Sequence, residues 1–310
     1  MNKSDKIFVA GHRGMVGSAI VRKLKMDGYS NIIFRSSKEL DLRNQRHVEE
    51  FFLSEKPDYI FLAAAKVGGI LANNTYKASF IYDNLSIQNN VIHAAYKYHV
   101  KKLLFLGSSC IYPKFADQPI IEESLLTSEL EPTNEPYAIA KIAGLKMCQF
   151  YREQYNYNFI SLMPANLYGP NDNFDLKNSH VLPALLRKFH EAKINKKSSV
   201  TLWGTGSPLR EFLHVNDLAK ACIHFMLTYN EKSPVNIGTG KDISIHELAS
   251  EIKKIVGFEG EILWDKNKPD GTPRKLMDVT KAKQSGWESS ITLLDGIRMT
   301  YDWYVQNKGK

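Results

Sequence analysis

Cysteine is scarce in this sequence, and long apolar runs are absent. The three cysteines, Cys110, Cys148 and Cys222, are odd in number, lack C-x-x-C spacing and have no accompanying pair of histidines. These features argue against a disulfide framework and against structural zinc, so we expect no metal and a reducing compartment. No apolar run is long enough to span a bilayer, and no export-type apolar segment lies near the start. We therefore expect a cytoplasmic protein without a membrane partner.

Clustered positive charge is also lacking, although the formal net charge is +8. The lysines and arginines are scattered, and their densest group is only Lys193, Lys196 and Lys197. Nucleic-acid binding usually requires basic residues gathered on one face. We therefore expect no nucleic-acid partner and favour small anionic ligands, which a positive protein attracts.

Short apolar runs alternate with longer segments of helical periodicity in the first half of the chain, as is typical of a parallel sheet with crossover helices. Strands are predicted at residues 6–10, 31–35, 59–63, 102–106 and 159–163, and helices at 15–27, 44–55, 78–99 and 137–155. We predict an α/β fold, namely a Rossmann-type doubly wound parallel sheet with a smaller, intertwined C-terminal substrate lobe. The sheet domain is expected to comprise residues 1–170 and 212–240, and the lobe residues 171–211 and 241–310.

A glycine-rich segment joins the first predicted strand to the first predicted helix. Glycines at this position permit a tight turn, close approach of the backbone to a pyrophosphate and close packing of helix on strand. The spacing is G-x-x-G-x-x-G, and a glycine triplet alone could be an ordinary turn. Because a strand precedes it and a helix follows, we predict a dinucleotide site. Its residues are Gly11, His12, Arg13, Gly14, Met15, Val16 and Gly17, of which His12 is also expected to pack or cap locally.

The end of the second predicted strand lacks the acidic residue that holds the ribose 2′-hydroxyl of NAD. It carries Arg35 and Ser37 instead, and a guanidinium with hydroxyl groups suits the 2′-phosphate of NADP. Arg13 could add a second cation, and the alternative is that Arg35 is a solvated charge at a strand end. We expect Asp41 and Leu42 to flank the adenine, with Asp41 accepting from its amino group.

Tyr137 and Lys141 lie one helical turn apart, on one face of a predicted helix. A nearby ammonium favours the phenolate, so we expect Lys141 to lower the pKa of Tyr137 toward neutrality and to allow proton exchange with a substrate oxygen. The spacing alone is weak evidence, because it recurs at residues 98–102 and 304–308, where we interpret it as structural.

Ser108 distinguishes Tyr137 from these repeats. It directly follows the fourth predicted strand, at the carboxyl edge where open α/β sheets bind ligands. Ser108 can share a substrate oxygen with Tyr137. The set Ser108, Tyr137 and Lys141, taken with the glycine loop, predicts hydride transfer at a carbonyl or carbinol.

The sequence resembles the extended short-chain dehydrogenases over nearly its whole length. The likeness rests on blocks at residues 11–17, 63–74, 107–113, 131–144, 164–170, 178–181, 210–215 and 269–275. Within that family it is most similar to enzymes that epimerise GDP-4-keto-6-deoxy-D-mannose at C3 and C5 and reduce it at C4 to GDP-L-fucose. The resemblance implies a GDP-sugar substrate, NADPH as the cofactor and a homodimer through helices near residues 84–95 and 140–151.

The resemblance also assigns roles to individual residues. Cys110 and His180 would form the epimerisation pair, although the chemistry of a single free cysteine favours a buried apolar residue. The GDP-sugar site would be lined by Lys188, Trp203, Arg210 and Asp270; the alternative is that Trp203 lies in the core and the cations on the surface. Further residues expected at the cofactor are Leu106, Gly107, Lys141, Pro164, Asn166, Leu167 and His180.

One residue departs from the family pattern, and three others are expected to be structural. Ser37 stands where relatives carry a second arginine, which puts a strong preference for NADPH over NADH in doubt. Cys148 and Cys222 lie in apolar helical patterns, and His214 is expected to be a hydrogen-bonded structural residue.

Two other functions remain open at this point. A nucleotide-sugar 4-epimerase would keep NAD tightly bound, but it would have no use for Cys110 and His180. A non-catalytic NADP-sensing or RNA-associated protein could share the fold, since fold alone does not fix function. The intact set of five catalytic candidates argues against that reading.

Overall fold

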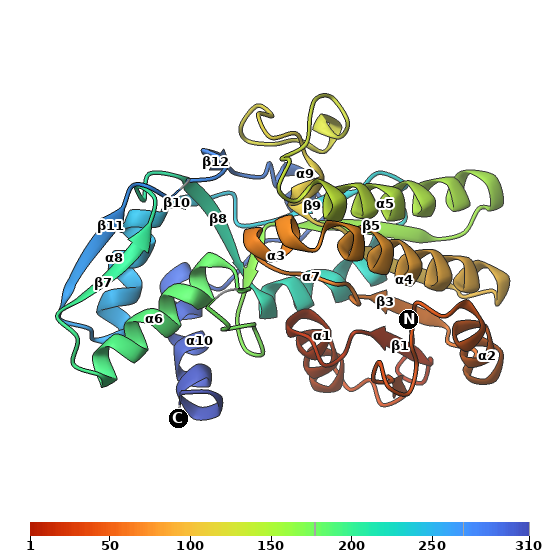
Figure 1. Ribbon diagram of the computed structural model, residues 1–310. Helices are drawn as coiled ribbons and strands as arrows, with labels where there is room; N and C mark the ends of the chain where they lie inside the picture. The colour runs from red at the N-terminus through yellow and green to blue at the C-terminus, as the bar shows by residue number, and fades with distance from the viewer. Residues whose placement is uncertain (177, 269, 310) are drawn as a thin grey trace.

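The computed structural model describes residues 1–176, 178–268 and 270–309; Pro269, part of one motif above, lies outside the described residues. A six-stranded sheet forms its centre, in the order β2-β1-β3-β4-β5-β9 (Figure 1). Every neighbouring pair in this sheet is parallel. The strands are β1 (Ile7–Ala10), β2 (Ile32–Ile33), β3 (Tyr59–Leu62), β4 (Lys102–Leu106), β5 (Phe159–Pro164) and β9 (Val235–Ile237). The prediction of a doubly wound parallel sheet is confirmed, although β2 is shorter than the predicted strand at 31–35.

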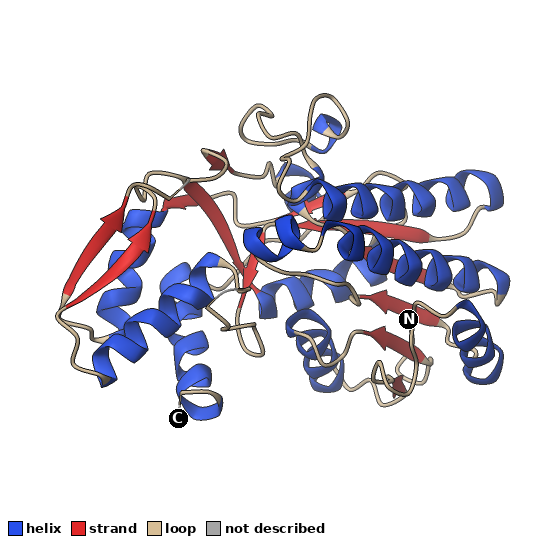
Figure 2. Ribbon diagram, viewed as in Figure 1, coloured by secondary structure: helices blue, strands red, loops and turns tan. Residues whose placement is uncertain are grey.

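Helices cover both faces of this sheet (Figure 2). On one face α1 (Met15–Met26) packs against α7 (Val215–Thr228), and on the other α2 (Gln45–Glu55), α4 (Lys77–Lys97) and α5 (Glu135–Tyr155) lie side by side. The inner strands β1 and β4 are buried along their whole length, which explains why they read as continuous apolar runs rather than as alternating patterns.

The second lobe is built around three helices, α6 (Val181–Ile194), α8 (Ile245–Val256) and α10 (Leu293–Asn307). Their apolar faces meet in a separate cluster that includes the buried Leu186, Phe189, Leu248, Ile252 and Ile297. Two small sheets flank these helices: β7 (Ser199–Trp203) with β11 (Glu261–Asp265), and β6 (Asn166–Tyr168), β8 (Leu209–His214), β10 (Asp242–Ser244) and β12 (Arg274–Lys275).

A C-terminal segment of the chain leaves the lobe and packs on the main sheet, which the sequence did not predict. Met277, Val279 and Trp287 join the core of the main sheet, and the short helix α9 (Thr280–Gln284) contacts β9. This stretch lies within the segment 241–310 that was expected to belong wholly to the lobe.

Two further segments matter for the site. The short helix α3 (Ile70–Thr75) follows β3, and the stretch after β4 contains the 3-10 turns η1 (Ser109–Ile111) and η2 (Glu122–Ser124). In the described part of the chain, no helix is both long and apolar enough to cross a membrane.

Candidate active site

The glycine loop sits between β1 and α1, as predicted, and its three glycines meet different surroundings. Gly11 has a φ of +88°, and a Cβ there would lie 2.8 Å from the Ala64 Cα. A Cβ on Gly17 would overlap the Gly11 carbonyl oxygen and lie 2.9 Å from the His12 Cα. At Gly14, by contrast, the nearest atom would be the Gly11 oxygen at 3.4 Å, an ordinary contact. Gly11 and Gly17 therefore allow the close backbone contacts of the loop, and Gly14 leaves space open beside it.

The N-terminus of α1 is free to bind an anion. No side chain caps it and no acidic residue lies in its first turn. Unpaired backbone N–H groups and the helix dipole favour a phosphate at this position. The His12 ring stacks on Phe34, with ring centroids 4.5 Å apart, so His12 packs locally as expected.

The corner expected to hold the 2′-phosphate is more crowded than the sequence indicates. Arg35 donates a hydrogen bond of 2.6 Å to the Glu55 carboxylate, so it is not merely a solvated charge. Glu39 also lies here, and it accepts hydrogen bonds from the backbone and hydroxyl of Ser36 at 2.7 and 2.6 Å. These contacts, and more weakly Arg13 and Arg35, lower the pKa of Glu39. An acidic group is therefore present at this edge, although not at the strand end.

Asp41, expected to face the adenine, is already paired. Arg43 donates to both of its carboxylate oxygens at 2.9 Å, and a third hydrogen bond of 3.0 Å comes from the Arg43 backbone. These hydrogen bonds lower the pKa of Asp41, so the carboxylate stays ionised. An adenine amino group would share Asp41 with Arg43.

Ser108, Tyr137 and Lys141 come together at the carboxyl end of β4. Ser108 caps η1 by accepting from the Cys110 backbone at 3.2 Å, and its hydroxyl also hydrogen-bonds Tyr137. Tyr137 stands in the first turn of α5, where Glu135 and an adjacent proline favour helix initiation. Lys141 follows one turn later, and its buried ammonium donates a 2.7 Å hydrogen bond to the Leu106 carbonyl. The three side chains predicted to act together are thus neighbours.

The expected effect of Lys141 on Tyr137 is not found. Burial, and then the neighbouring Cys110, raise the pKa of Tyr137, while the Ser108 hydrogen bond opposes the rise. The Lys141 ammonium lies 5.8 Å from the centre of the Tyr137 ring, and burial lowers its own pKa to about 7. The prediction of a depressed tyrosine pKa is therefore wrong for this protein without ligands, because desolvation outweighs a cation that is itself easily neutralised.

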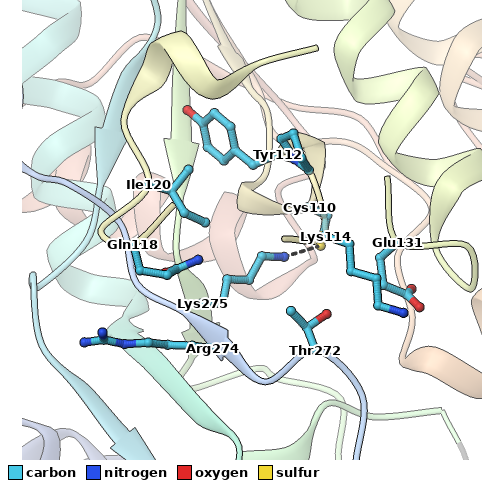
Figure 3. Close-up of a pocket in the computed structure, with 10 residues that line it drawn as sticks. Cys110, Tyr112, Lys114, Gln118, Ile120, Glu131, Thr272, Arg274 and Lys275 are labelled. Carbon is cyan, nitrogen blue, oxygen red and sulfur yellow. Dashed lines mark hydrogen bonds between the residues drawn. The ribbon is translucent and has the colours of Figure 1, made fainter. Parts of the chain in front are cut away.

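Cys110 lines a small cavity, shown in Figure 3, and its charge also acts on Tyr137. Its sulfur accepts a hydrogen bond from the Lys275 ammonium at 3.5 Å. His180 stands immediately before α6, and burial and then the Lys275 charge lower its pKa. Taken as a whole residue His180 is exposed, although its titratable ring is surrounded by protein. The two residues of the expected epimerisation pair therefore share one cationic neighbour, which the sequence reasoning did not single out.

The residues expected to bind the sugar nucleotide lie in the second lobe. Trp203 is 61% exposed at the end of β7, so the alternative that it belongs to the core is excluded. The ammonium groups of Lys188 and Lys268 lie 5.9 and 5.6 Å from the centre of its ring. Asp270 accepts from the backbone and hydroxyl of Thr205 at 2.7 and 2.8 Å, which ties two loops together. An open aromatic face flanked by cations suits a base and a diphosphate.

Arg210 connects this region to Cys110. Burial lowers its pKa, and the charges of Cys110 and Asp270 act in the opposite direction. Its guanidinium donates to the Leu209 carbonyl at 2.8 Å.

Residues expected near the nicotinamide also lie at this edge. Pro164 ends β5, and Leu167 lies in β6, which pairs with β8. The Asn166 amide donates to the Glu211 carbonyl at 2.8 Å, so it holds β6 to β8. Gly107 is packed so closely against Met163 that a Cβ would overlap the Met163 sulfur.

The structural expectations for four other residues are met. His214 is buried and caps α7 by accepting from the Asn216 backbone at 3.3 Å. Cys148 and Cys222 are buried in α5 and α7. Lys102, from one of the repeated Tyr-x-x-x-Lys patterns, donates to the Phe225 and Met226 carbonyls at 3.1 and 2.7 Å.

A glycine-rich βα turn with Ser, Tyr and Lys at the carboxyl edge of a parallel sheet is the arrangement of an extended short-chain dehydrogenase. Comparison with known proteins agrees, since the chain belongs to the NAD dependent epimerase/dehydratase family, whose model matches residues 7–238.

Relatives with curated names cover almost the whole chain. It is 63% identical to GDP-L-fucose synthase 1 of Arabidopsis thaliana, over 99% of this chain and 95% of that protein. It is 54% identical to the GDP-L-fucose synthase of Escherichia coli (strain K12), over 99% of this chain and 98% of that protein. Among solved structures, a GDP-L-fucose synthetase from Naegleria fowleri bound to NADP superposes with a TM-score of 0.92 at 29% identity, covering 99% and 96% of the two chains.

Proposed function

We propose that this chain converts GDP-4-keto-6-deoxy-D-mannose to GDP-L-fucose, by epimerisation at C3 and C5 and NADPH-dependent reduction at C4. The observation that carries the proposal is the position of Cys110, whose sulfur lies beside Tyr137 and on the same short segment as Ser108. A group that can remove a carbon-bound proton thus adjoins a pair that can hold a carbonyl oxygen. The relatives named GDP-L-fucose synthase support this substrate.

The loop from Gly11 to Gly17 would hold the pyrophosphate of the cofactor. The open outer side of Gly14 and the uncapped start of α1 fit that group. NADPH, when bound, supplies the hydride that reduces the ketone. Arg13 and Arg35 would bind the 2′-phosphate, with Arg35 partly neutralised by Glu55. Its affinity for the phosphate would be weaker than that of an unpaired arginine.

Epimerisation follows from the acidity of carbons next to a ketone. Cys110 and His180 would serve as the base and acid that exchange the protons at C3 and C5, through enolates. Ser108 and Tyr137 would donate hydrogen bonds to the enolate oxygen at C4. The raised pKa of Tyr137 keeps its phenol protonated, which suits a donor to that oxygen and the acid that protonates it on reduction.

The second lobe would bind the GDP group. Trp203 would offer its exposed face to the guanine, and Lys188 and Arg210 would bind the diphosphate; the exposure of Trp203 and the closeness of Lys188 to its ring support this. Asp270, which accepts a hydrogen bond from the Thr205 hydroxyl, would line the same binding site. We divide the chain accordingly into a cofactor domain, residues 1–170 and 212–240, and a substrate lobe formed by the remainder, with the stretch around α9 packed on the first.

We further propose a cytoplasmic homodimer that carries both activities in each subunit. The outer surface of α4 and α5 supports the dimer, because Phe150 on α5 is 57% exposed and Tyr82 on α4 is also open. Light scattering should give twice the mass of one chain, and Phe150→Glu should reduce it. Met26→Glu, on α1 and 81% exposed, is the matched control. A monomeric wild-type protein would refute the dimer.

The Cys110→Ser variant tests the proposed function. Its hydroxyl is too weak an acid to supply a base at neutral pH, so product formation should fall at least tenfold while NADPH binding stays unchanged. Both are measured directly, the first by chromatography of the nucleotide sugars and the second by fluorescence titration. Unchanged formation of GDP-L-fucose would remove Cys110 from the mechanism.

A further inference from the structure

Lys275 acts on both of the side chains proposed to move protons. Its ammonium donates to the Cys110 sulfur at 3.5 Å (Figure 3), and its positive charge lowers the pKa of His180. Neither the sequence pattern nor the Ser-Tyr-Lys set assigns it a function. Its electrostatic effect on both Cys110 and His180 suggests a function in proton transfer.

The fold holds this side chain in place. Lys275 belongs to β12, which pairs in parallel with β8 and sets Lys275 opposite Arg210. Arg274, the preceding residue of the strand, lines the same cavity but pairs with Asp242 at 2.6 Å. Just after Lys275, the Leu276 backbone donates to the Gln118 side chain at 2.8 Å.

Hydrogen bonds to the Glu211 carboxylate hold the residues that follow β12 in place. The Met277 backbone donates to the buried Glu211 carboxylate at 2.9 Å, and that carboxylate also accepts from the Gly240 backbone at 2.8 Å. The strand that carries Lys275 is therefore fastened to β8 and to the segment that follows Cys110. These hydrogen bonds hold the backbone of Lys275 within reach of the sulfur.

Cations dominate the charges around Cys110. The titratable and charged groups that face it or line its cavity are Lys275, Arg210, Tyr137, Tyr112, Lys114, Glu131 and Arg274. Glu131 is engaged by Thr133 and Asn134 of its own turn, and Arg274 is paired with Asp242. Lys275 is thus the cation in direct contact with the sulfur, and a thiolate is the anion it would stabilise.

We propose that Lys275 is a positioning residue for epimerisation, which holds Cys110 as the thiolate that removes a proton next to the ketone. This inference rests on the proposed function. In the step, the C–H bond breaks, its proton forms the S–H bond of Cys110, and the electron pair moves to the C4 oxygen as the enolate. A proton from His180 to the opposite face of the carbon restores the ketone. The same cation repels the protonated form of His180 and so makes it a stronger acid.

Alkylation of Cys110 tests this inference without any sugar. Cys148 and Cys222 are buried, so in the folded enzyme iodoacetamide reports on Cys110. In Lys275→Met, the pH at which alkylation reaches half its maximal rate should rise by about one unit, the Coulomb effect of one charge at that distance in water. Lys275→Arg should keep the wild-type midpoint, and so should Lys254→Met, which removes an exposed charge on α8. If Lys275→Met does not fold, Lys275→Gln serves in its place.

Solvent deuterium exchange into the substrate supplies the second readout. At pH 7, Lys275→Met should exchange about tenfold more slowly than wild type, in proportion to the lost thiolate, and should recover above pH 9. An unchanged alkylation midpoint in the charge-free variants would overturn the inference, as would a loss of exchange that high pH does not restore. A shifted midpoint in an enzyme that does not turn over the sugar would refute the proposed substrate and leave the Lys275–Cys110 coupling standing.

Discussion

Two glycines of the cofactor loop should respond differently to the same substitution. In Gly17→Ala, the added Cβ would lie 2.5 Å from the Gly11 carbonyl carbon and 2.9 Å from the His12 Cα. Both are backbone atoms of the turn, so the loop or the helix must shift. Overpacking of this kind costs about 1–3 kcal/mol of the free energy of unfolding.

Gly14→Ala is the matched case, with the same added methyl group in the same loop. Gly14 has φ −74° and ψ 167°, which alanine adopts readily, and its Cβ would meet no atom closer than 3.4 Å. The free energy of unfolding should therefore stay the same or rise by up to about 1 kcal/mol. The methyl group would nevertheless stand on the side where a pyrophosphate would approach. The loss of one or two hydrogen bonds to a charged phosphate, at about 1.5–3 kcal/mol each, would weaken NADPH binding at least tenfold.

Urea unfolding and fluorescence titration with NADPH separate the two effects. We expect Gly17→Ala to lose both stability and binding, and Gly14→Ala to lose binding alone. Wild-type affinity for NADPH in Gly14→Ala would refute the placement of the pyrophosphate at this loop, and wild-type stability in Gly17→Ala would refute the argument from close packing.

Two further predictions concern the substrate lobe and the helix cap at His214. Trp203→Ala should raise KM for the GDP-sugar about tenfold with little change in kcat, because stacking on a base is worth about 1–3 kcal/mol. The control is Trp287→Ala, in the buried core, which should lower stability instead. Equal KM values in Trp203→Ala and wild type would place the base elsewhere. Burial lowers the pKa of His214 from 6.5 to about 4, so the folded state binds its proton less tightly than the unfolded state, and stability should fall as the pH drops from about 6.5 to about 4, by up to about 3 kcal/mol. His214→Asn keeps a capping side chain and should flatten this part of the stability–pH curve measured by urea unfolding; an unchanged slope would assign it to other groups.

The fold and much of the site could be predicted because their signals are local. Buried parallel strands are continuous apolar runs, and the crossover helices carry apolar residues every three to four positions. The glycine loop occupies the turn between β1 and α1. The positions of Ser108 and Tyr137 in the fold could be predicted for a related reason, since Ser108 closely follows the apolar strand β4 and Tyr137 lies in the first turn of α5.

What the sequence could not show depends on contacts between distant segments. Lys275 meets Cys110 only because the two-residue strand β12 joins β8, and nothing in the local pattern reveals that pairing. Glu55 pairs with Arg35 from the end of α2, which no strand-end pattern predicts. The raised pKa of Tyr137 likewise reflects the burial of its hydroxyl group in the folded protein, which a pattern of spacing does not report.

The central claim is that one site epimerises and reduces the same sugar, and incubation in heavy water tests it most directly. The purified protein is mixed with GDP-4-keto-6-deoxy-D-mannose and NADPH in deuterium oxide, and the product is read by proton NMR and mass spectrometry. The account predicts GDP-L-fucose with solvent deuterium at both C3 and C5. A product reduced at C4 that carries no deuterium would contradict it, because Cys110 and His180 would then have moved no protons.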